Sequence, residues 1–507
     1  MNAEPTNAPL EGGGDADALG AEQAALYKRR AMLGAIAMIA RTIVLQVVIF
    51  ACNIVLARKL DPRDFGVFGV LQFALAFFAF FGDAGLGAAL VQKKQPPKER
   101  ELASVFGFQM GVSLVIVGAL VLGARGMGLL WRDLPSGYAW LVRVMSLNLL
   151  LVSARVVPSI LMERELKFGR LAVLEVVRQT GFYAATVVLA LMGHGVWSLV
   201  MGVLAEGIIG VVLAYALHPW RPRVSFDWPL LRPIVRYGVS YQVKGLIGFV
   251  NGATMPIYAG AALGTKAFGL ISWAQTTAYF PLKLVEIMAR VTFPLLSRFQ
   301  TDEELFAQSL TRSVQVCVMG TLFFVGLFLG LGPNVTVIVF TAKWLPAVPV
   351  LYVFSAAISI GFLSPLIAAA LDAMNKPGVF WRIALSWTIF NWIMVAIATP
   401  RWGMLGFAVG YSVHVVIGNV VIIFVTKKLI PKAKLWPRVR GAIVGGVAVG
   451  LASHFALKPW VVTWPRLVAG MGGLLALFAA VVLVIDRQML KDTLALIPKR
   501  QRAASVG

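Results

Sequence analysis

Charged side chains inside long apolar runs are the features of this sequence that could do chemistry. A charge in lipid hydrocarbon costs at least ~2.5–3.5 kcal/mol, so such a residue normally faces an interior, pairs with an opposite charge, or acts on a substrate. The apolar runs hold eleven candidates: Arg41, Asp83, Arg143, Arg155, Glu175, Arg178, Glu206, Lys244, Lys283, Glu286 and Arg290. Basic side chains in a cavity of low dielectric constant attract anions, most naturally a phosphate or a diphosphate.

The depth of these residues indicates one positively charged layer. At a rise of ~1.5 Å per residue, seven of them lie about 7–14 Å from the ends of their runs that are predicted to be cytoplasmic. Five of the seven are basic, and these are predicted to bind the diphosphate: Arg41, Lys244, Arg155, Arg178 and Lys283. The carboxylates are predicted to be their charge partners or to couple transport to an ion: Asp83, Glu286 and Glu206.

Several of these charges also have a simpler interpretation. Lys283 with Glu286, and Glu175 with Arg178, are spaced i,i+3, so each pair could neutralise itself on one helix face. Glu206 could be a proton-coupling carboxylate or the partner of an arginine, and both interpretations stay open. Two arginines near the ends of their runs can extend to the interface and are interpreted as structural: Arg143 and Arg290.

The composition predicts that the elements carrying these charges are membrane-spanning helices. Hydrophobic residues make up 59% of the 507 residues and charged residues 14%, against roughly 45–50% and about 25% in ordinary globular proteins. A span needs ~20 apolar residues in a row, and the chain has enough for about fourteen. A soluble enzyme is therefore excluded. Two cysteines in apolar runs and four scattered histidines offer no ligand spacing, so no metal or cofactor is expected.

The predicted spans alternate with basic segments that give the orientation. They cover residues 33–56, 65–91, 103–124, 138–162, 171–192, 196–216, 237–260, 267–291, 314–333, 346–371, 379–399, 404–426, 439–457 and 466–486. Lysine and arginine gather in alternate loops, for example 93–100 and 427–440. Because basic residues collect in cytoplasmic loops, both termini are expected in the cytoplasm. The net charge of +23 therefore reflects orientation and does not indicate nucleic-acid binding.

An internal repeat organises the spans into two halves. A shift of 203 residues aligns LDPRDFGVFGVLQFALAF (60–77) with LGTKAFGLISWAQTTAYF (263–280). It also places Arg41 on Lys244 and Asp83 on Glu286. An even number of spans separates equivalent elements, so the halves share one orientation and are related by an axis along the membrane normal. The expected fold is an all-α polytopic membrane protein with two pseudo-symmetric six-helix lobes around a central cavity, plus two C-terminal helices.

This organisation predicts five segments. They are a disordered cytoplasmic tail (1–27), an N-terminal six-helix lobe (28–220), a C-terminal six-helix lobe (221–436), two additional helices (437–486) and a basic cytoplasmic tail (487–507). The chain has no phosphate-binding loop, since GAALGTK (260–266) has the wrong spacing, so it does not drive itself with ATP. It also has no extramembrane constellation of catalytic residues, so a transporter is expected and not an enzyme.

An ordered set of motifs resembles the Wzx-type polysaccharide transporters of the multidrug/oligosaccharidyl-lipid/polysaccharide exporter superfamily. The motifs are LARKLDPRDFGVFGV (56–70), GDAGLGAALVQ (82–92), LMERELKFGRLA (161–172), GVWSLV (195–200), PWRPRVSFDWPLLRPIVRYG (219–238), TFPLLSRFQTDEELF (292–306) and TAKWLPA (341–347). The resemblance covers about residues 28–430, whereas 437–507 matches only in having two further spans.

The resemblance implies a flippase of the bacterial inner membrane that alternates between two openings. Such proteins move undecaprenyl-diphosphate-linked oligosaccharides for exopolysaccharide, capsule or O-antigen assembly, which implies a polysaccharide polymerase and export machinery as partners. Related flippases bind the diphosphate with cavity arginines, one of them on the first span, and Arg41 occupies such a position. Lys244 keeps the charge but lacks the bidentate fork. The alternatives are a cation-coupled multidrug exporter and, from another class, a membrane polysaccharide polymerase or ligase.

Overall fold

The computed structural model describes residues 45–83, 85–93, 95–433 and 439–486. These residues form helices and turns without a strand, and eleven of the helices are long and apolar enough to cross a membrane. This confirms an all-α polytopic membrane protein, while the count of fourteen spans and the symmetry of two whole lobes stay predictions. The predicted tails (1–27 and 487–507) and most of the first predicted span lie outside the described residues.

The chain divides into two units, residues 1–53 and 54–507. The described residues of the first unit, 45–53, are helical. The second unit begins with the end of that helix and continues through α2 (Pro62–Asp83), α3 (Leu86–Gln92), α4 (Glu99–Gly123), α5 (Met127–Leu130), α6 (Tyr138–Ala154), α7 (Val156–Arg164), α8 (Phe168–Leu191) and α9 (Val196–Leu217).

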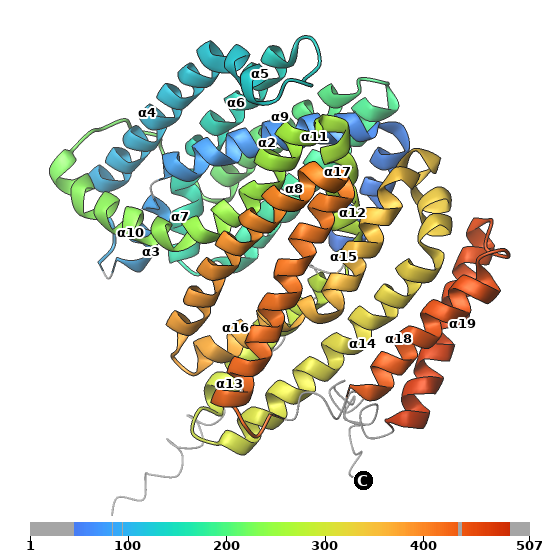
Figure 1. Cartoon of the computed structure of the whole chain (residues 1–507). Helices are drawn as coiled ribbons and strands as arrows, with labels where there is room; N and C mark the ends of the chain where they lie inside the picture. The colour runs from blue at the N-terminus through green and yellow to red at the C-terminus, as the bar shows by residue number, and fades with distance from the viewer. Residues whose placement is uncertain (1–44, 84, 94, 434–438, 487–507) are drawn as a thin grey trace, which may run out of the picture. The chain divides into compact units, whose positions relative to one another are not determined.

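The remaining helices of the second unit follow an extended linker. They are α10 (Trp228–Ala253), the π-helix η2 (Thr254–Ala259), α11 (Gly260–Leu263), α12 (Thr265–Ala278), α13 (Leu282–Arg298), α14 (Glu303–Val335), η3 (Thr336–Phe340), η4 (Ala342–Ala347), α15 (Val348–Gly361), α16 (Leu363–Ala373), α17 (Pro377–Leu429), α18 (Arg440–Ala452), η5 (Ser453–Leu457) and α19 (Trp464–Ile485). The last pair forms a hairpin in which α18 packs along α14 and against α19 (Figure 1).

Two expectations about continuous spans need correction. The predicted span 65–91 is two helices, because Gly85 takes a left-handed conformation with φ 64° between α2 and α3. The predicted span 267–291 is also two helices, since Pro281, which cannot donate a backbone hydrogen bond, separates α12 from α13. The predicted spans 379–399 and 404–426 are two separate arms of α17, as expected: the chain turns back at Trp402 and Gly403, where the dihedral angles are non-helical, and a Cβ atom built on Gly410 would lie 2.8 Å from the Met394 carbonyl oxygen.

The fourth predicted span of each half is interrupted at a corresponding place. Helices α6 and α7 meet at Arg155, and helices α15 and α16 meet at Phe362. A proline follows three residues later in both cases, Pro158 and Pro365. Proline lacks the N–H that would bond to the carbonyl four residues earlier, so it interrupts a helix near this point. Prolines at matching positions of two halves are a marker of substrate sites in transporters.

Helices α2 and α12 cross in backbone contact. A Cβ atom built on Gly66 would lie 1.7 Å from the Thr265 carbonyl oxygen, and one built on Gly269 would lie 1.8 Å from the Pro62 carbonyl oxygen. The shift of 203 residues maps Pro62 onto Thr265 and Gly66 onto Gly269, so the two contacts are reciprocal. This reciprocity is what a two-fold relation between segments 60–77 and 263–280 requires.

Candidate functional site

Three of the predicted site residues, Arg155, Arg178 and Glu206, lie together in the first half with Glu175, and we call these four residues the arginine cluster. The α6–α7 junction, α8 and α9 supply them. Arg178 Nη2 lies 2.8 Å from Glu175 Oε2, and Arg178 Nη1 lies 3.2 Å from Glu206 Oε1. The i,i+3 pair is therefore formed, and Glu206 pairs with an arginine from the neighbouring helix.

Arg155 is the one cation of this cluster without a carboxylate partner. Within the described parts of the chain, no carboxylate oxygen lies within 4.0 Å of its guanidinium, and its buried Nε has no hydrogen-bond partner. Both arginine stems lie against Gly210 of α9, where a Cβ atom would be 3.0 Å from Arg178 Cδ and 3.2 Å from Arg155 Cδ. The glycine thus lets two guanidinium groups approach each other, while only one of them is neutralised.

The arginine cluster is partly accessible at the surface of the protein. The Arg178 side chain is 17% exposed, that of Glu206 25% and that of Glu175 42%. Charged groups at this depth face a bundle interior or an aqueous space, because direct exposure to lipid is costly. An anion in such a space could bind Arg155 without displacing a carboxylate, whereas Arg178 already holds two. A planar guanidinium with free N–H groups suits a phosphate oxygen pair.

The helix interruption at Arg155 is a feature that sequence reasoning missed. The predicted span over 138–162 was treated as one helix, although Pro158 lies inside it. A proline inside an apolar run was the available signal, and Pro365 in the other half repeats it. The interruption brings Arg155 to the end of α6, with φ −91° and ψ −1°.

The other predicted site residues do not join the arginine cluster. Lys283 and Glu286 form their own i,i+3 pair on α13, with Nζ 3.1 Å from Oε2 and about half of each side chain exposed. Arg41 lies outside the described residues. Lys244 lies on α10 and Asp83 at the end of α2, but their side chains are outside the described part of the structure. The single charged layer stays a prediction.

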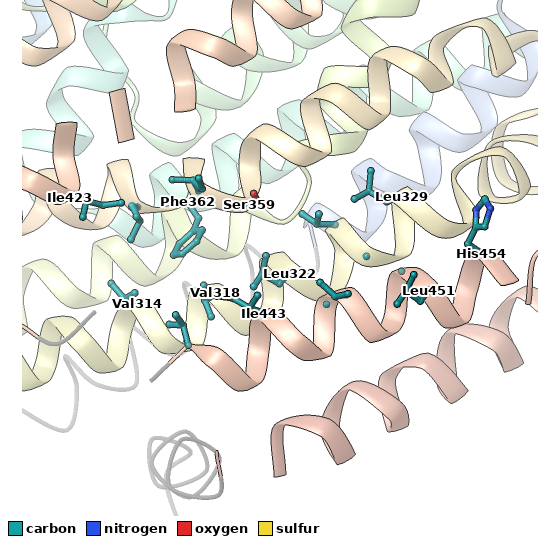
Figure 2. A pocket seen from close by; sticks show the side chains of 18 of the residues that line it. Val314, Val318, Leu322, Leu329, Ser359, Phe362, Ile423, Ile443, Leu451 and His454 are labelled. Carbon is teal, nitrogen blue, oxygen red and sulfur yellow. The ribbon is translucent and has the colours of Figure 1, made fainter. Parts of the chain in front are cut away.

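An apolar cavity of about 710 Å³ lies between α14, the α15–α16 junction and α18. Figure 2 shows lining side chains from three elements: Val318 and Leu322 of α14, Ile443 and Leu451 of α18, and Phe362 of the α15–α16 junction. Its lining contains few polar side chains, among them Ser359 and His454. The interruption of the second half therefore borders an apolar space, whereas that of the first half carries charges.

A polar latch joins the two halves at the ends of α2 and α12 predicted to lie outside the cytoplasm. The Asp133 carboxylate accepts from the Thr265 backbone N–H at 3.1 Å and from the Thr265 hydroxyl at 2.9 Å, which caps α12. Its other oxygen lies 3.1 Å from Arg63 Nη2 on α2. The Trp131 indole N–H adds a bond of 2.9 Å to the Pro256 carbonyl. These bonds join the two halves at that end.

We expect the latch to weaken in acid. The Thr265 hydroxyl and N–H and the nearby Arg63 hold the pKa of Asp133 below its ordinary value. A depressed pKa means that the stabilisation is present at neutral pH and is lost as the pH falls through the folded-state pKa, below about 3.9. Asp133→Ala should cost about 1 kcal/mol at pH 7, mainly through loss of the helix cap.

Thermal unfolding of the purified protein at several pH values checks this prediction for Asp133. The difference between wild type and variant should be largest at neutral pH and should shrink on acidification. The matched control is Asp302→Ala, which removes the cap of α14 within one half. A difference for Asp133→Ala that grew in acid would contradict the assignment.

Comparisons with known proteins agree with this architecture. Residues 55–349 match the family described as "Polysaccharide biosynthesis protein". The chain is 25% identical over 470 residues to the succinoglycan biosynthesis transport protein ExoT of Rhizobium meliloti (strain 1021), covering 89% of this chain and 93% of that protein. It is 23% identical over 380 residues to the lipopolysaccharide biosynthesis protein WzxC of Escherichia coli (strain K12), covering 74% and 76%.

Solved structures share the fold at low sequence identity. The lipid II flippase MurJ in an inward closed conformation superposes with a TM-score of 0.69 at 13% identity, covering 90% of this chain and 100% of that one. An inward-facing multidrug resistance transporter of the MATE family and MOP superfamily gives 0.60 at 14% identity, covering 78% and 96%. The family match confirms the resemblance to polysaccharide biosynthesis proteins, while the two solved structures show a shared fold alone.

Proposed function

Because this chain belongs to the polysaccharide biosynthesis protein family, we propose that it is a flippase for lipid-linked oligosaccharides. Its substrate is a sugar repeat unit joined through a diphosphate to undecaprenol. It moves this unit from the inner to the outer leaflet of the bacterial inner membrane for exopolysaccharide, capsule or O-antigen assembly. The observation that carries the proposal is Arg155, a cation without a carboxylate partner at an interrupted intramembrane helix.

In this proposal the arginine cluster binds the diphosphate from the cytoplasmic side. Arg155 supplies the free guanidinium, and Arg178 adds a second positive charge beside it. Arg41 and Lys244, which the repeat makes equivalent, are proposed to bind the same anion from the first and seventh spans. Lys283 is paired with the carboxylate of Glu286, so we propose that it contributes less to diphosphate binding. Asp83 is proposed as a charge partner.

The polyprenyl tail is proposed to use the apolar cavity between α14 and α18. Its lining of valine, leucine and isoleucine offers a lipid chain the same surroundings as hydrocarbon. The sugars occupy the aqueous space, and the tail stays in contact with the bilayer.

Transport is proposed to proceed by rocking of the two halves. The latch at Asp133 and the α2–α12 crossing support a state that is closed on the non-cytoplasmic side, with both termini in the cytoplasm. Breaking the latch would expose the headgroup outside. An inside-negative potential favours outward movement of an anion by ~2.3 kcal/mol per charge per 100 mV, so voltage can help drive the step.

Transport by the purified protein in vesicles tests the function. A labelled diphosphate-linked oligosaccharide lipid is placed inside, and its exposure is scored with an external glycosidase. We expect exposure that depends on the protein, and none for the same oligosaccharide on a neutral lipid, since that lipid lacks the anion. Failure under every applied voltage and ion gradient would contradict the flippase and favour the multidrug exporter.

The pair Arg41→Ala/Lys244→Ala tests the wider anion site in the same assay. Removing both charges should lower transport at least tenfold if each contributes a charged hydrogen bond of about 1.5 kcal/mol. Folding is checked by size-exclusion chromatography. Unchanged transport would remove these two residues from the site and leave the proposed function standing.

A further inference from the structure

The Tyr215 hydroxyl occupies the position that the proline at the α6–α7 interruption leaves open. Tyr215 Oη of α9 donates to the Ala154 carbonyl oxygen at 2.9 Å. In an uninterrupted helix that carbonyl would accept from the N–H of residue 158, which is a proline and has none. The tyrosine therefore supplies the missing donor. A carbonyl left unpaired there would cost the free energy of a buried unsatisfied acceptor.

This hydrogen bond fixes the peptide from which Arg155 extends. Ala154 is the last residue of α6 and Arg155 follows it directly. The intrahelical bond from Arg155 N to the Leu151 carbonyl is long, at 3.4 Å, so the helix itself holds the junction only weakly. The Tyr215 hydroxyl is thus a main restraint on the orientation of this peptide.

Three residues of α9 contact the two arginines or the peptide that carries one of them. Glu206 pairs with Arg178, Gly210 makes room for both arginine stems, and Tyr215 holds the junction at Arg155. We infer that Tyr215 is a positioning residue for substrate binding, which acts through the Ala154 carbonyl on Arg155. This inference rests on the proposed function, because it requires that Arg155 binds the diphosphate.

The chain offers a matched control for the loss of such a hydroxyl. Tyr258 Oη donates to the Ala396 carbonyl at 3.2 Å, and the residue four positions later is Pro400. A tyrosine hydroxyl thus again donates to a carbonyl that a proline leaves without its helical N–H donor, here in α17. Tyr258 contacts no member of the arginine cluster. Tyr215→Phe and Tyr258→Phe each remove one hydroxyl from one such carbonyl, so similar melting temperatures are expected.

Transport kinetics in vesicles distinguish an effect of Tyr215 on the binding site from a general effect on protein stability. Tyr215→Phe should raise KM for the diphosphate-linked lipid about fivefold, the effect of one hydrogen bond, and should change kcat less than twofold. Tyr258→Phe should leave KM unchanged. In an Arg155→Gln background, Tyr215→Phe should have no further effect on KM, because a double-mutant cycle shows coupling when one residue acts through another.

Three results would overturn the inference. Equal KM values for Tyr215→Phe and Tyr258→Phe would mean that the hydroxyl does not position the binding site. A fivefold effect that persists in the Arg155→Gln background would mean that Tyr215 does not act through Arg155. Failure of the proposed function looks different, because then the wild-type protein shows no transport. Unchanged kinetics for Arg155→Gln would instead remove Arg155 from the binding site, and the inference about Tyr215 with it, while the flippase function stands.

Discussion

Gly269→Ala is expected to disrupt the contact between the two halves of the protein. A Cβ atom there would lie 1.8 Å from the Pro62 carbonyl oxygen, well inside any allowed contact distance. The obstacle is backbone, so no side-chain rotation can relieve it, and α2 must move away from α12. We expect a loss of about 3 kcal/mol, at the upper end of overpacking effects. The thermal unfolding midpoint of the purified protein measures this loss.

Gly118→Ala is the matched control for this change. Gly118 lies within α4 and a Cβ atom there would meet nothing within 4 Å, so the substitution adds only helix propensity. It should leave the midpoint unchanged or raise it slightly, by the equivalent of about 0.5–1 kcal/mol. If Gly269→Ala unfolded at the same temperature as Gly118→Ala, the backbone contact between α2 and α12 would not exist in solution. Gly66→Ala, at the reciprocal position, should repeat the effect of Gly269→Ala.

Arg155→Gln is expected to have the largest effect on transport. Hydrogen bonds to charged groups contribute about 1.5–3 kcal/mol, so the efficiency of transport should fall about tenfold to 150-fold. Glutamine keeps a polar side chain but is shorter and lacks the charge. Because both nearby carboxylates are paired with Arg178 and none in the described part of the chain lies within 4.0 Å of Arg155, the variant should remain folded. Arg178→Gln should instead lower stability, since it leaves Glu175 and Glu206 without their partner.

Arg143→Gln controls for loss of an arginine from the same region of sequence. Arg143 Nε donates to the Val121 carbonyl at 3.1 Å, and its guanidinium lies 4.9 Å from the centre of the Trp140 ring. Both contacts are structural, so transport by this variant should stay within about twofold of wild type, once folding is matched by melting temperature. Equal losses for Arg143→Gln and Arg155→Gln would contradict a specific role for Arg155.

The helical spans follow from the sequence because their signals are local. A run of about 20 apolar residues must form a helix in lipid to satisfy its own backbone groups. The ion pairs Glu175–Arg178 and Lys283–Glu286 could also be predicted from the sequence, since i,i+3 spacing brings two side chains together on any helix. The ordered motifs over 56–347 were also sufficient to indicate the family, whose match covers residues 55–349.

Contacts between helices could not be predicted from such local signals. The sequence left Glu206 with two interpretations, and only the packing of α8 on α9 brings it 3.2 Å from Arg178. It gave Arg155 and Arg178 the same predicted role, whereas the structure neutralises one and leaves the other without a carboxylate. The cap that Asp133 supplies to Thr265 joins residues 132 positions apart.

The sequence by itself therefore determined that the chain is an all-helical membrane protein, which neighbouring charges pair, and which family the motifs resemble. The tertiary structure decided which arginine remains free, where the Ala154 carbonyl finds its donor, and how Gly66 and Gly269 bring two helices into contact. The physical reason is that hydropathy and helical spacing act over a few residues of one chain segment. The rotation and depth at which two helices pack depend on the shapes of both surfaces at once.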